Sequence, residues 1–227
     1  MPQTILAFDT SGPYIAAGIR PSEVPPRFEE TAKGQAERLM PICAELLGEA
    51  ELAPSDLTAI AVGVGPGNFT GVRIAVSAAR GMALALGIPA IGVTGFELLS
   101  QEFGRPVRVV LSLPAPQGRA YIQAFSEGRP AGIPALTTPG SSESGLMQPN
   151  LLVAGYRARD IAEPYDAPWD ESCWDNRSPE MTAANLALIA SGKLETAGGV
   201  WRDRPVPLYI RAADAAPPRH AAPRIIA

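Results

Sequence analysis

The stretch LTAIAVGVGPGNFTGVRIAVSAARGMALALGIPAIGVTGFELL, residues 57–99, decides the fold of this chain. Its first part, residues 57–64, is a short apolar run typical of a buried strand. A glycine turn follows, and residues 70–86 have the length and composition of a helix. Residues 90–93 predict a second strand, and a capping box starts the next helix at Gly95. Together these segments predict one α/β crossover unit.

The helix predicted over residues 70–86 is apolar around most of its circumference. After Val72 its polar side chains are Arg73, Ser77 and Arg80, which form one narrow stripe. An ordinary surface helix is apolar over a stripe of about 100° and polar elsewhere. Two interpretations therefore stay open. Either the helix is sandwiched inside its own domain, or its second apolar face meets another subunit, with small residues allowing close approach.

The turn Gly65-Pro66-Gly67-Asn68 is only a weak signal for phosphate binding. Backbone N–H groups before the N-terminus of a helix can hold a phosphate. The Lys-Ser/Thr pair of a Walker A loop does not follow Gly67, and the glycine spacing of a dinucleotide-binding motif is not met.

Composition and charge exclude several classes of protein. The chain has 227 residues, 46% of them hydrophobic, which is enough for one large domain or two small lobes. The net charge of −4 argues against a chain that grips nucleic acid alone, since that needs a basic patch. No apolar run approaches the roughly 18 residues of a membrane span, and the N-terminus lacks the pattern of a signal peptide. We therefore expect a cytoplasmic protein.

The single histidine of the chain is His220, in a proline-rich tail. Serine or cysteine nucleophile systems therefore lack a histidine base in the body of the protein. Histidine-rich metal sites are excluded for the same reason. Cys43 and Cys173 are far apart and have no metal-binding or redox spacing. We expect no catalytic residue and no metal ligand in this chain.

At the N-terminus, a strand over residues 4–8 runs into Asp9-Thr10-Ser11-Gly12, and a second strand follows over residues 14–19. This pattern resembles the first phosphate-binding hairpin of the actin, sugar-kinase and Hsp70 superfamily, in which the carboxylate helps place a metal-bound phosphate. The alternative is that Asp9 and Thr10 bond the backbone of their own turn. The possible nucleotide contacts are Asp9, Thr10, Ser11, Gly65 and Gly67.

Three stretches together resemble the N-terminal lobe of the TsaB (YeaZ) family. They are ILAFDTSGPYIAAGI at residues 5–19, AERLMPICAELL at 36–47, and the long segment at 56–99 that contains GPGNFTGVRI. PLYIR at residues 207–211 resembles the ending of the same family. The first of the three carries the phosphate-type hairpin, and the second lies in a helix predicted over residues 35–50. Pro41 predicts either a kink in that helix or a later start.

The resemblance implies an α/β protein with the two-lobed fold shared by actin, sugar kinases and Hsp70. Each lobe is then a mixed sheet with flanking helices. The implied division is an N-terminal lobe at residues 1–104, which carries the GPGNFTGVRI motif and the partner-binding helices, and a smaller C-terminal lobe at 105–211. Residues 212–227 are an Ala/Pro-rich tail without a core-forming pattern.

The resemblance also implies a function. TsaB proteins belong to the machinery that makes N6-threonylcarbamoyladenosine at position 37 of tRNAs reading codons that begin with A. TsaD is the catalytic subunit, TsaB is its non-catalytic dimerisation partner, and the ATPase TsaE joins them. The chain is then expected to bind TsaD, to form a homodimer when alone, and to meet tRNA only indirectly through the complex. ATP and Mg²⁺ would be bound at the assembled complex rather than by this chain alone.

The enzyme alternative is a free-standing ATP-binding phosphotransferase or ATPase of the same superfamily, and it rests on the Asp9 hairpin alone. In the family, helices of the N-terminal lobe pack against matching helices of TsaD, which would explain the second apolar face. The expected interface residues are Leu39, Phe69, Val72, Arg73, Ala75, Val76, Ala79, Arg80 and Ala83.

The second half of the chain predicts a hairpin with strands over residues 107–111 and 118–125. Two departures from the family argue against independent catalysis. Residues 113–117 read Leu-Pro-Ala-Pro-Gln where many members carry Asp-Ala-Arg, and residues 35–37 read Gln-Ala-Glu where many carry His-Ser-Glu. Residues 157–177 are predicted to form an acidic surface loop held by its tryptophans. A final helix is expected from Ser178 to about Gly192.

Overall fold

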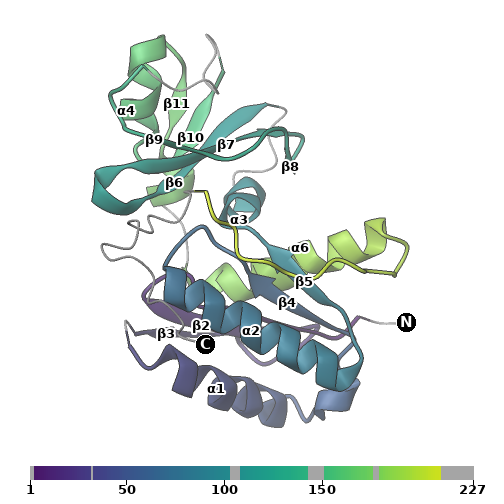
Figure 1. Cartoon of the computed structure of the whole chain (residues 1–227). Helices are drawn as coiled ribbons and strands as arrows, with labels where there is room; N and C mark the ends of the chain where they lie inside the picture. The colour runs from purple at the N-terminus through teal and green to yellow at the C-terminus, as the bar shows by residue number, and fades with distance from the viewer. Residues whose placement is uncertain (1–2, 32, 103–107, 143–150, 176–178, 211–227) are drawn as a thin grey trace, which may run out of the picture.

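Two mixed β-sheets, one in each lobe, organise the chain (Figure 1). The first lobe lies below the second in that view, and the short helix α3 lies between the two sheets. The computed structural model describes residues 3–31, 33–102, 108–142, 151–175 and 179–210.

The first sheet has the strand order β3-β2-β1-β4-β5. Strands β1, β2 and β3 form an antiparallel meander, whereas β4 and β5 join β1 in parallel. Parallel neighbours need a crossover, and a helix supplies it. The strands are β1 (Ile5–Asp9), β2 (Tyr14–Arg20), β3 (Arg27–Glu30), β4 (Ala59–Gly63) and β5 (Ala90–Val93).

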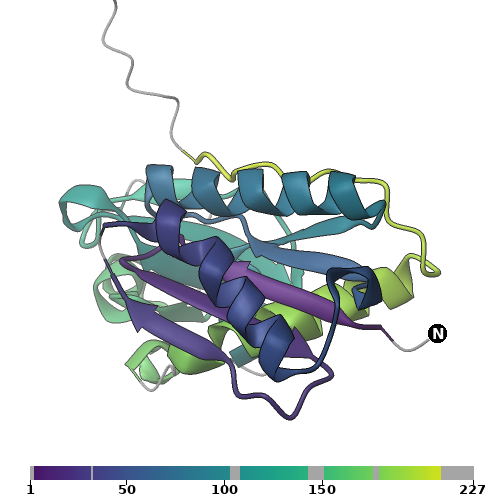
Figure 2. The same ribbon diagram turned by 90° about the horizontal axis from the view of Figure 1, so that it is seen from below.

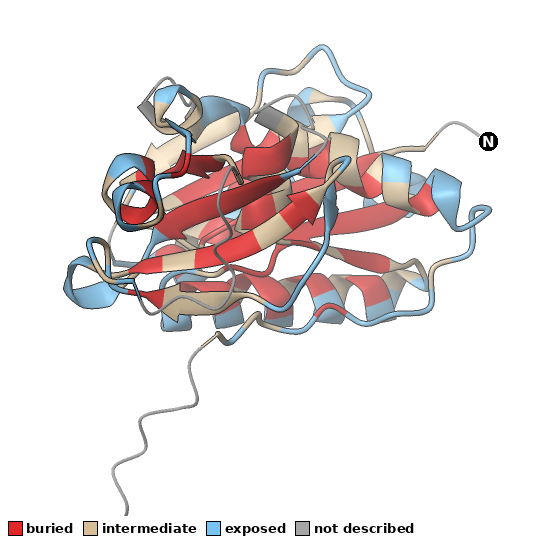
Figure 3. Ribbon diagram, turned by 90° about the horizontal axis from the view of Figure 1, so that it is seen from above, coloured by how far each residue is buried: buried red, intermediate tan, exposed pale blue. Residues whose placement is uncertain are grey.

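Helices cover both faces of this sheet (Figure 2). Helices α1 (Gln35–Glu49) and α2 (Phe69–Leu86) lie on one face and α6 (Thr182–Thr196) lies on the other. Side chains alternate along β1 in the same way, because Leu6 and Phe8 pack with α1 and α2 whereas Ile5 packs with α6. Figure 3 shows that the strands are largely buried and that the helices flanking them are exposed on their outer sides.

The second sheet has the order β11-β10-β6-β7-β8, and β9 pairs with β7. Helix α3 (Gly95–Glu102) covers one face, where Phe96 and Leu99 pack with strand residues, and α4 (Ala158–Ala162) covers the other. The strands are β6 (Val109–Pro114), β7 (Ala120–Ser126), β8 (Arg129–Pro130), β9 (Ala135–Thr137), β10 (Val153–Gly155) and β11 (Trp169–Asp170). The remaining short helices are α5 (Ser172–Asp175), η1 (Pro54–Asp56), η2 (Pro116–Gly118), η3 (Glu163–Tyr165) and η4 (Pro179–Met181).

The positions of α3 and α6 in the chain do not match the sheets against which these helices pack. Helix α3 precedes the second sheet in the chain but lies in its core, whereas α6 follows that sheet and returns to the first one. The predicted lobe boundaries at residues 104 and 211 both lie outside the described residues, so that division stays a prediction.

The last described segment, residues 200–210, runs along α2 and crosses to the second lobe (Figures 1 and 2). We call it the C-terminal strap. The backbone N–H of Leu208 donates to the Val64 carbonyl oxygen at 2.8 Å. The Leu208 side chain packs against the cores of both lobes, and Ile210 packs against the second one. The strap therefore ties the two lobes together.

The structure excludes one of the alternatives left by the sequence and corrects two expectations. Helix α1 includes Pro41 in its interior, so the later start is excluded. The last helix continues beyond Gly192 to Thr196, because Leu194 belongs to the core beneath the first sheet. The acidic segment is not a plain loop, since α4, β11 and α5 form within it and Asp160 and Glu163 pair with arginines.

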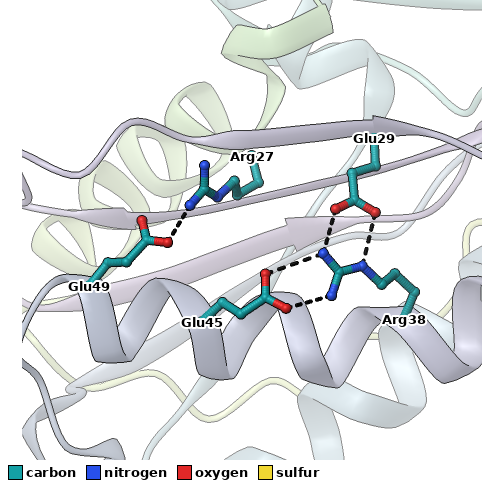
Figure 4. Close-up of polar contacts among 5 residues, drawn as sticks. All are labelled: Arg27, Glu29, Arg38, Glu45 and Glu49. Atoms are coloured by element: carbon teal, nitrogen blue, oxygen red, sulfur yellow. Dashed lines mark hydrogen bonds and ion pairs between the residues drawn. The ribbon is translucent and has the colours of Figure 1, made fainter.

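A charged cluster joins α1 to the edge strand β3 (Figure 4). Arg38 Nη2 lies 2.6 Å from Glu29 Oε1, and Arg38 Nη1 lies 2.6 Å from Glu45 Oε1. Arg27 forms an ion pair with Glu49. The hydrogen bonds that Arg38 donates to the carboxylates of Glu29 and Glu45 raise the pKa of Arg38, and the bond to Glu45 lowers the pKa of that carboxyl. Because these groups are open to water, their contribution to stability is small and sensitive to salt.

Cys43 lies on the buried face of α1, and burial raises the pKa of its thiol to about 12. At pH 8 only about one thiol in ten thousand is then a thiolate, which is the reactive form. In a Cys173→Ser background we expect Ellman's reagent to label Cys43 only after unfolding in urea. Rapid labelling of the native protein at pH 8 would contradict this burial.

Candidate functional site

Helix α2 is positioned by the glycine turn and by its own cap. The Asn68 side-chain oxygen accepts from the backbone N–H groups of Thr70 at 3.0 Å and Gly71 at 3.2 Å. At the other end Gly87 adopts φ 68°, in the left-handed region that favours glycine. The helix therefore begins and ends where local sequence signals place it.

One face of α2 belongs to the core of this chain. Most of the residues expected at an interface are buried in the core between α1, α2 and the first sheet. A partner cannot reach these side chains without unfolding the lobe. Only the exposed residues of this lobe can therefore contact a partner directly. The buried members of the expected set are Leu39, Val72, Ala75, Val76, Ala79 and Ala83.

The opposite side of the helix, which we call the α2 outer face, consists of Phe69, Arg73, Ser77, Arg80 and Leu84. Leu84 is 85% exposed and Phe69 is 52% exposed, which is unusual for large apolar side chains. Of the expected interface residues, Phe69, Arg73 and Arg80 lie here. The helix is thus not sandwiched in its own domain, because its second face is open in the single chain.

An aromatic and arginine cluster marks the N-terminal end of this face. The Arg73 guanidinium lies 3.6 Å from the centroid of the Phe69 ring, and Arg73 Nε donates to the Tyr209 hydroxyl at 2.8 Å. The Phe69 and Tyr209 ring centroids are 5.5 Å apart. Aromatic residues and arginine are enriched at protein interfaces, where they contribute much of the binding energy.

Tyr209 was missed as a site residue by sequence reasoning. It lies 136 positions from Arg73 in the chain, and only the path of the C-terminal strap brings the two together. A usable signal was present in the sequence, because PLYIR at residues 207–211 is part of the family resemblance.

Helix α2 also has the length and mean hydropathy, 1.3, of a membrane-spanning segment. In this structure it is the crossover helix between β4 and β5 and packs against the first sheet. Its apolar composition therefore reflects, at least on one side, packing in the core of its own lobe.

The Asp9 hairpin is closed by its own hydrogen bonds. Asp9 Oδ1 accepts from the Ser11 backbone N–H at 2.9 Å, and Oδ2 accepts from the Ser11 hydroxyl at 2.8 Å and the Tyr14 hydroxyl at 2.7 Å. Thr10 Oγ1 donates to the Gly71 carbonyl oxygen at 2.6 Å. These bonds favour the interpretation that Asp9 and Thr10 hold the turn and the start of α2.

Three glycines allow close approach to the hairpin, two of them against its backbone and one against the Asp9 side chain. A Cβ atom at Gly67 would lie 2.3 Å from the Ser11 carbonyl oxygen, and one at Gly71 would lie 1.8 Å from that of Thr10. At Gly63 it would lie 2.2 Å from Asp9 Oδ1.

The cleft between the lobes is small. It has a volume of about 130 Å³ and is lined by Asp9, Ser11, Gly65 and Gly67 together with residues of the second lobe. Pockets for drug-sized ligands have about 300–1,000 Å³. Across the part of the chain that the structure describes, no group of three or more His, Cys, Asp or Glu residues could hold a metal ion.

The chain can now be compared with known proteins. The family model for TsaD, tRNA N6-adenosine threonylcarbamoyltransferase, matches residues 23–123. An uncharacterised protein of Mycobacterium tuberculosis is 31% identical over 221 residues, 94% of each chain. TsaB of Escherichia coli, a tRNA threonylcarbamoyladenosine biosynthesis protein, is 32% identical over 121 residues, 52% of each chain.

The solved structure of YeaZ from Pseudomonas aeruginosa superimposes with a TM-score of 0.69 at 28% identity and covers 91% of this chain and 99% of its own. The chain belongs to the TsaB (YeaZ) family. The expected fold class, two actin-like lobes with mixed sheets and flanking helices, is confirmed by the sheets described above and by this match.

Proposed function

We propose that this TsaB-family protein is a non-catalytic subunit in threonylcarbamoyladenosine biosynthesis and binds TsaD through the α2 outer face and Tyr209. The observation that carries the proposal is an exposed row of Phe69, Arg73, Arg80 and Leu84 on a helix of the lobe that matches the family. In this proposal TsaE joins the pair, tRNA is met only through the complex, and the protein acts in the cytoplasm.

The chemistry of the face suits a helical partner. Gly81 and Ala85 are exposed on the same helix, so a second helix could approach closely between Arg80 and Leu84. The Phe69–Arg73–Tyr209 cluster would form the anchor at one end and Leu84 the contact at the other. The two arginines on this face would meet carboxylates of the partner.

The test is co-elution with TsaD of the same organism in gel filtration. Leu84→Glu should weaken the complex by about 3 kcal/mol, or roughly a hundredfold in Kd, because it places an unpaired charge in an apolar contact. Ile133→Glu is the matched control, since Ile133 is also 85% exposed but lies in the second lobe. The proposal is wrong if both variants keep full TsaD binding while the wild-type complex forms.

Without TsaD, we propose that the same face pairs two copies of this chain. A two-fold contact is the commonest way to cover such a surface. Light scattering at tens of micromolar should then give a dimer for the wild type and a monomer for Leu84→Glu. A wild-type monomer at that concentration would argue against the homodimer and leave the TsaD contact to be judged by co-elution.

The alternative is a free-standing ATPase of the actin-like superfamily. The closed Asp9 hairpin and the small cleft disfavour it. We propose that Asp9, Thr10, Ser11, Gly65 and Gly67 serve the fold, and that ATP and Mg²⁺ belong to the assembled complex. Purified wild type and Asp9→Ala should therefore show equal, background ATP turnover. Turnover that survives rigorous purification and disappears in Asp9→Ala would establish the alternative instead.

A further inference from the structure

The α2 outer face continues onto the C-terminal strap, which lies beside the helix along its length (Figures 1 and 2). Two anchors hold the strap. Pro205 is buried near Gly92 of β5, and Leu208 donates its backbone N–H to the Val64 carbonyl oxygen at 2.8 Å. We call the α2 outer face together with the exposed residues of the strap the α2–strap face. The strap contributes Arg202, Asp203, Arg204, Val206 and Tyr209.

This face is positively charged in a chain that is negatively charged overall. Helix α2 contains Arg73 and Arg80 and no carboxylate, and the strap adds Arg202 and Arg204 against Asp203. Four arginines and one aspartate give a net charge of +3, whereas the whole chain has a net charge of −4. Charge of one sign gathered on one surface attracts partners of the opposite charge and repels partners of the same charge.

None of the four arginines pairs with a carboxylate among the described residues. Other arginines of the chain do form such pairs, for example Arg38 of α1 and Arg159 of α4. Arg73 contacts Phe69 and Tyr209, both of which are uncharged. The positive charge of the α2–strap face is therefore not compensated by the described part of the chain.

Apolar side chains on the same face indicate a protein, rather than a nucleic acid, as the partner. Leu84 on α2 is 85% exposed, and Val206 on the strap is 64% exposed. Nucleic-acid binding relies chiefly on basic and aromatic side chains, and aliphatic side chains add little to it. A protein surface that carries both carboxylates and apolar side chains matches both features of this face.

We propose that the α2–strap face selects an acidic protein partner over a second copy of this chain. In a two-fold pair the same patch faces itself, so the arginines of one copy would meet those of the other. Like charges placed opposite each other weaken such a pair, whereas carboxylates on a different partner strengthen it. The inference rests on the proposed function, and it adds that charge, including that of the strap, decides between TsaD and self-pairing.

The two associations should respond to salt in opposite directions, because salt screens attraction and repulsion alike. We expect the association rate constant with TsaD of the same organism to fall about tenfold between 50 and 500 mM NaCl. Surface plasmon resonance measures this rate. Over the same range the homodimer should become tighter, by about threefold in Kd, as measured by light scattering of the chain alone.

A double variant, Arg202→Gln with Arg204→Gln, isolates the contribution of the strap. Both side chains are exposed and have no described carboxylate partner, so the Tm should stay unchanged. Association with TsaD at 50 mM NaCl should slow about three- to tenfold at an unchanged dissociation rate, since exposed charges act mainly on the encounter. Arg129→Gln, at an exposed arginine of β8 in the second lobe, is the matched control and should change neither rate.

Three outcomes would overturn the proposal. One is TsaD binding whose association rate depends neither on NaCl nor on the two strap arginines. Another is a homodimer that weakens as NaCl is raised. The third is binding of unfractionated tRNA by this chain alone that the double variant abolishes, which would assign the face to phosphates. Failure of the wild type to bind TsaD at any salt concentration would count against the proposed function, whereas binding that is independent of charge counts against this inference alone.

Discussion

Gly71→Ala is expected to lower the free energy of unfolding by about 3 kcal/mol or more, at the upper end of the cost of overpacking. The new Cβ atom would lie 1.8 Å from the Thr10 carbonyl oxygen and 3.2 Å from Gln35 Oε1. Thr10 cannot retreat easily, because it is fully buried at the end of β1 and its hydroxyl is bonded to Gly71 itself. The Asp9 hairpin and α2 must therefore separate.

Gly81 provides the control within the same helix. No described atom lies within 4 Å of a Cβ placed there, so alanine adds helix propensity without a clash. Gly81→Ala should raise stability by about 0.5–1 kcal/mol. Urea unfolding monitored by circular dichroism measures both variants. If both variants changed the free energy of unfolding by the same amount in the same direction, the close contact between Gly71 and Thr10 would not be the reason that position 71 needs glycine.

Ala79→Glu is expected to prevent stable folding of the first lobe. Ala79 is fully buried on the inner face of α2, so the substitution places a carboxylate among apolar side chains. The penalty is several kcal/mol per buried ion, a large part of the 5–15 kcal/mol that stabilises a typical protein. Thermal unfolding of the purified protein, or its recovery in the insoluble fraction, measures the effect.

Ser77→Glu is the matched control for Ala79→Glu, since Ser77 lies two positions away on the α2 outer face and is exposed. It should change the Tm by no more than surface substitutions usually do. The neighbouring Ala78 is half-buried, so its Glu variant should fall between the two. A stable Ala79→Glu variant would mean that the inner face of α2 is not core.

Local chemistry made the central unit of the fold predictable. The bounds of α2, the cap at Asn68, the stop at Gly87 and the start of α3 at Gly95 follow from signals within a few residues. The predictions that failed concern segments whose structure depends on weak local signals or on distant contacts. The last helix extends beyond Gly192 because packing beneath the first sheet, rather than a local stop, decides its end.

The candidate site was only half predictable. The pattern at residues 70–86 identified a helix that is apolar around most of its circumference. Which side faces inward depends on how α2 lies on its sheet, and the structure places the polar stripe of Arg73, Ser77 and Arg80 on the exposed side. That placement buried Val72 and Ala79 and exposed Phe69 and Leu84. Tyr209 reaches the site through the C-terminal strap, and no helical or strand periodicity connects it with Arg73.

The amino-acid sequence by itself determined the crossover unit, the actin-like class and the family, because these depend on local propensity and on a specific motif. The tertiary structure alone decided which side of α2 is exposed, how the Asp9 hairpin is bonded, and how Tyr209 comes to lie beside Arg73. Each of these depends on contacts between segments far apart in the chain, whose geometry is set by the packing of both lobes together.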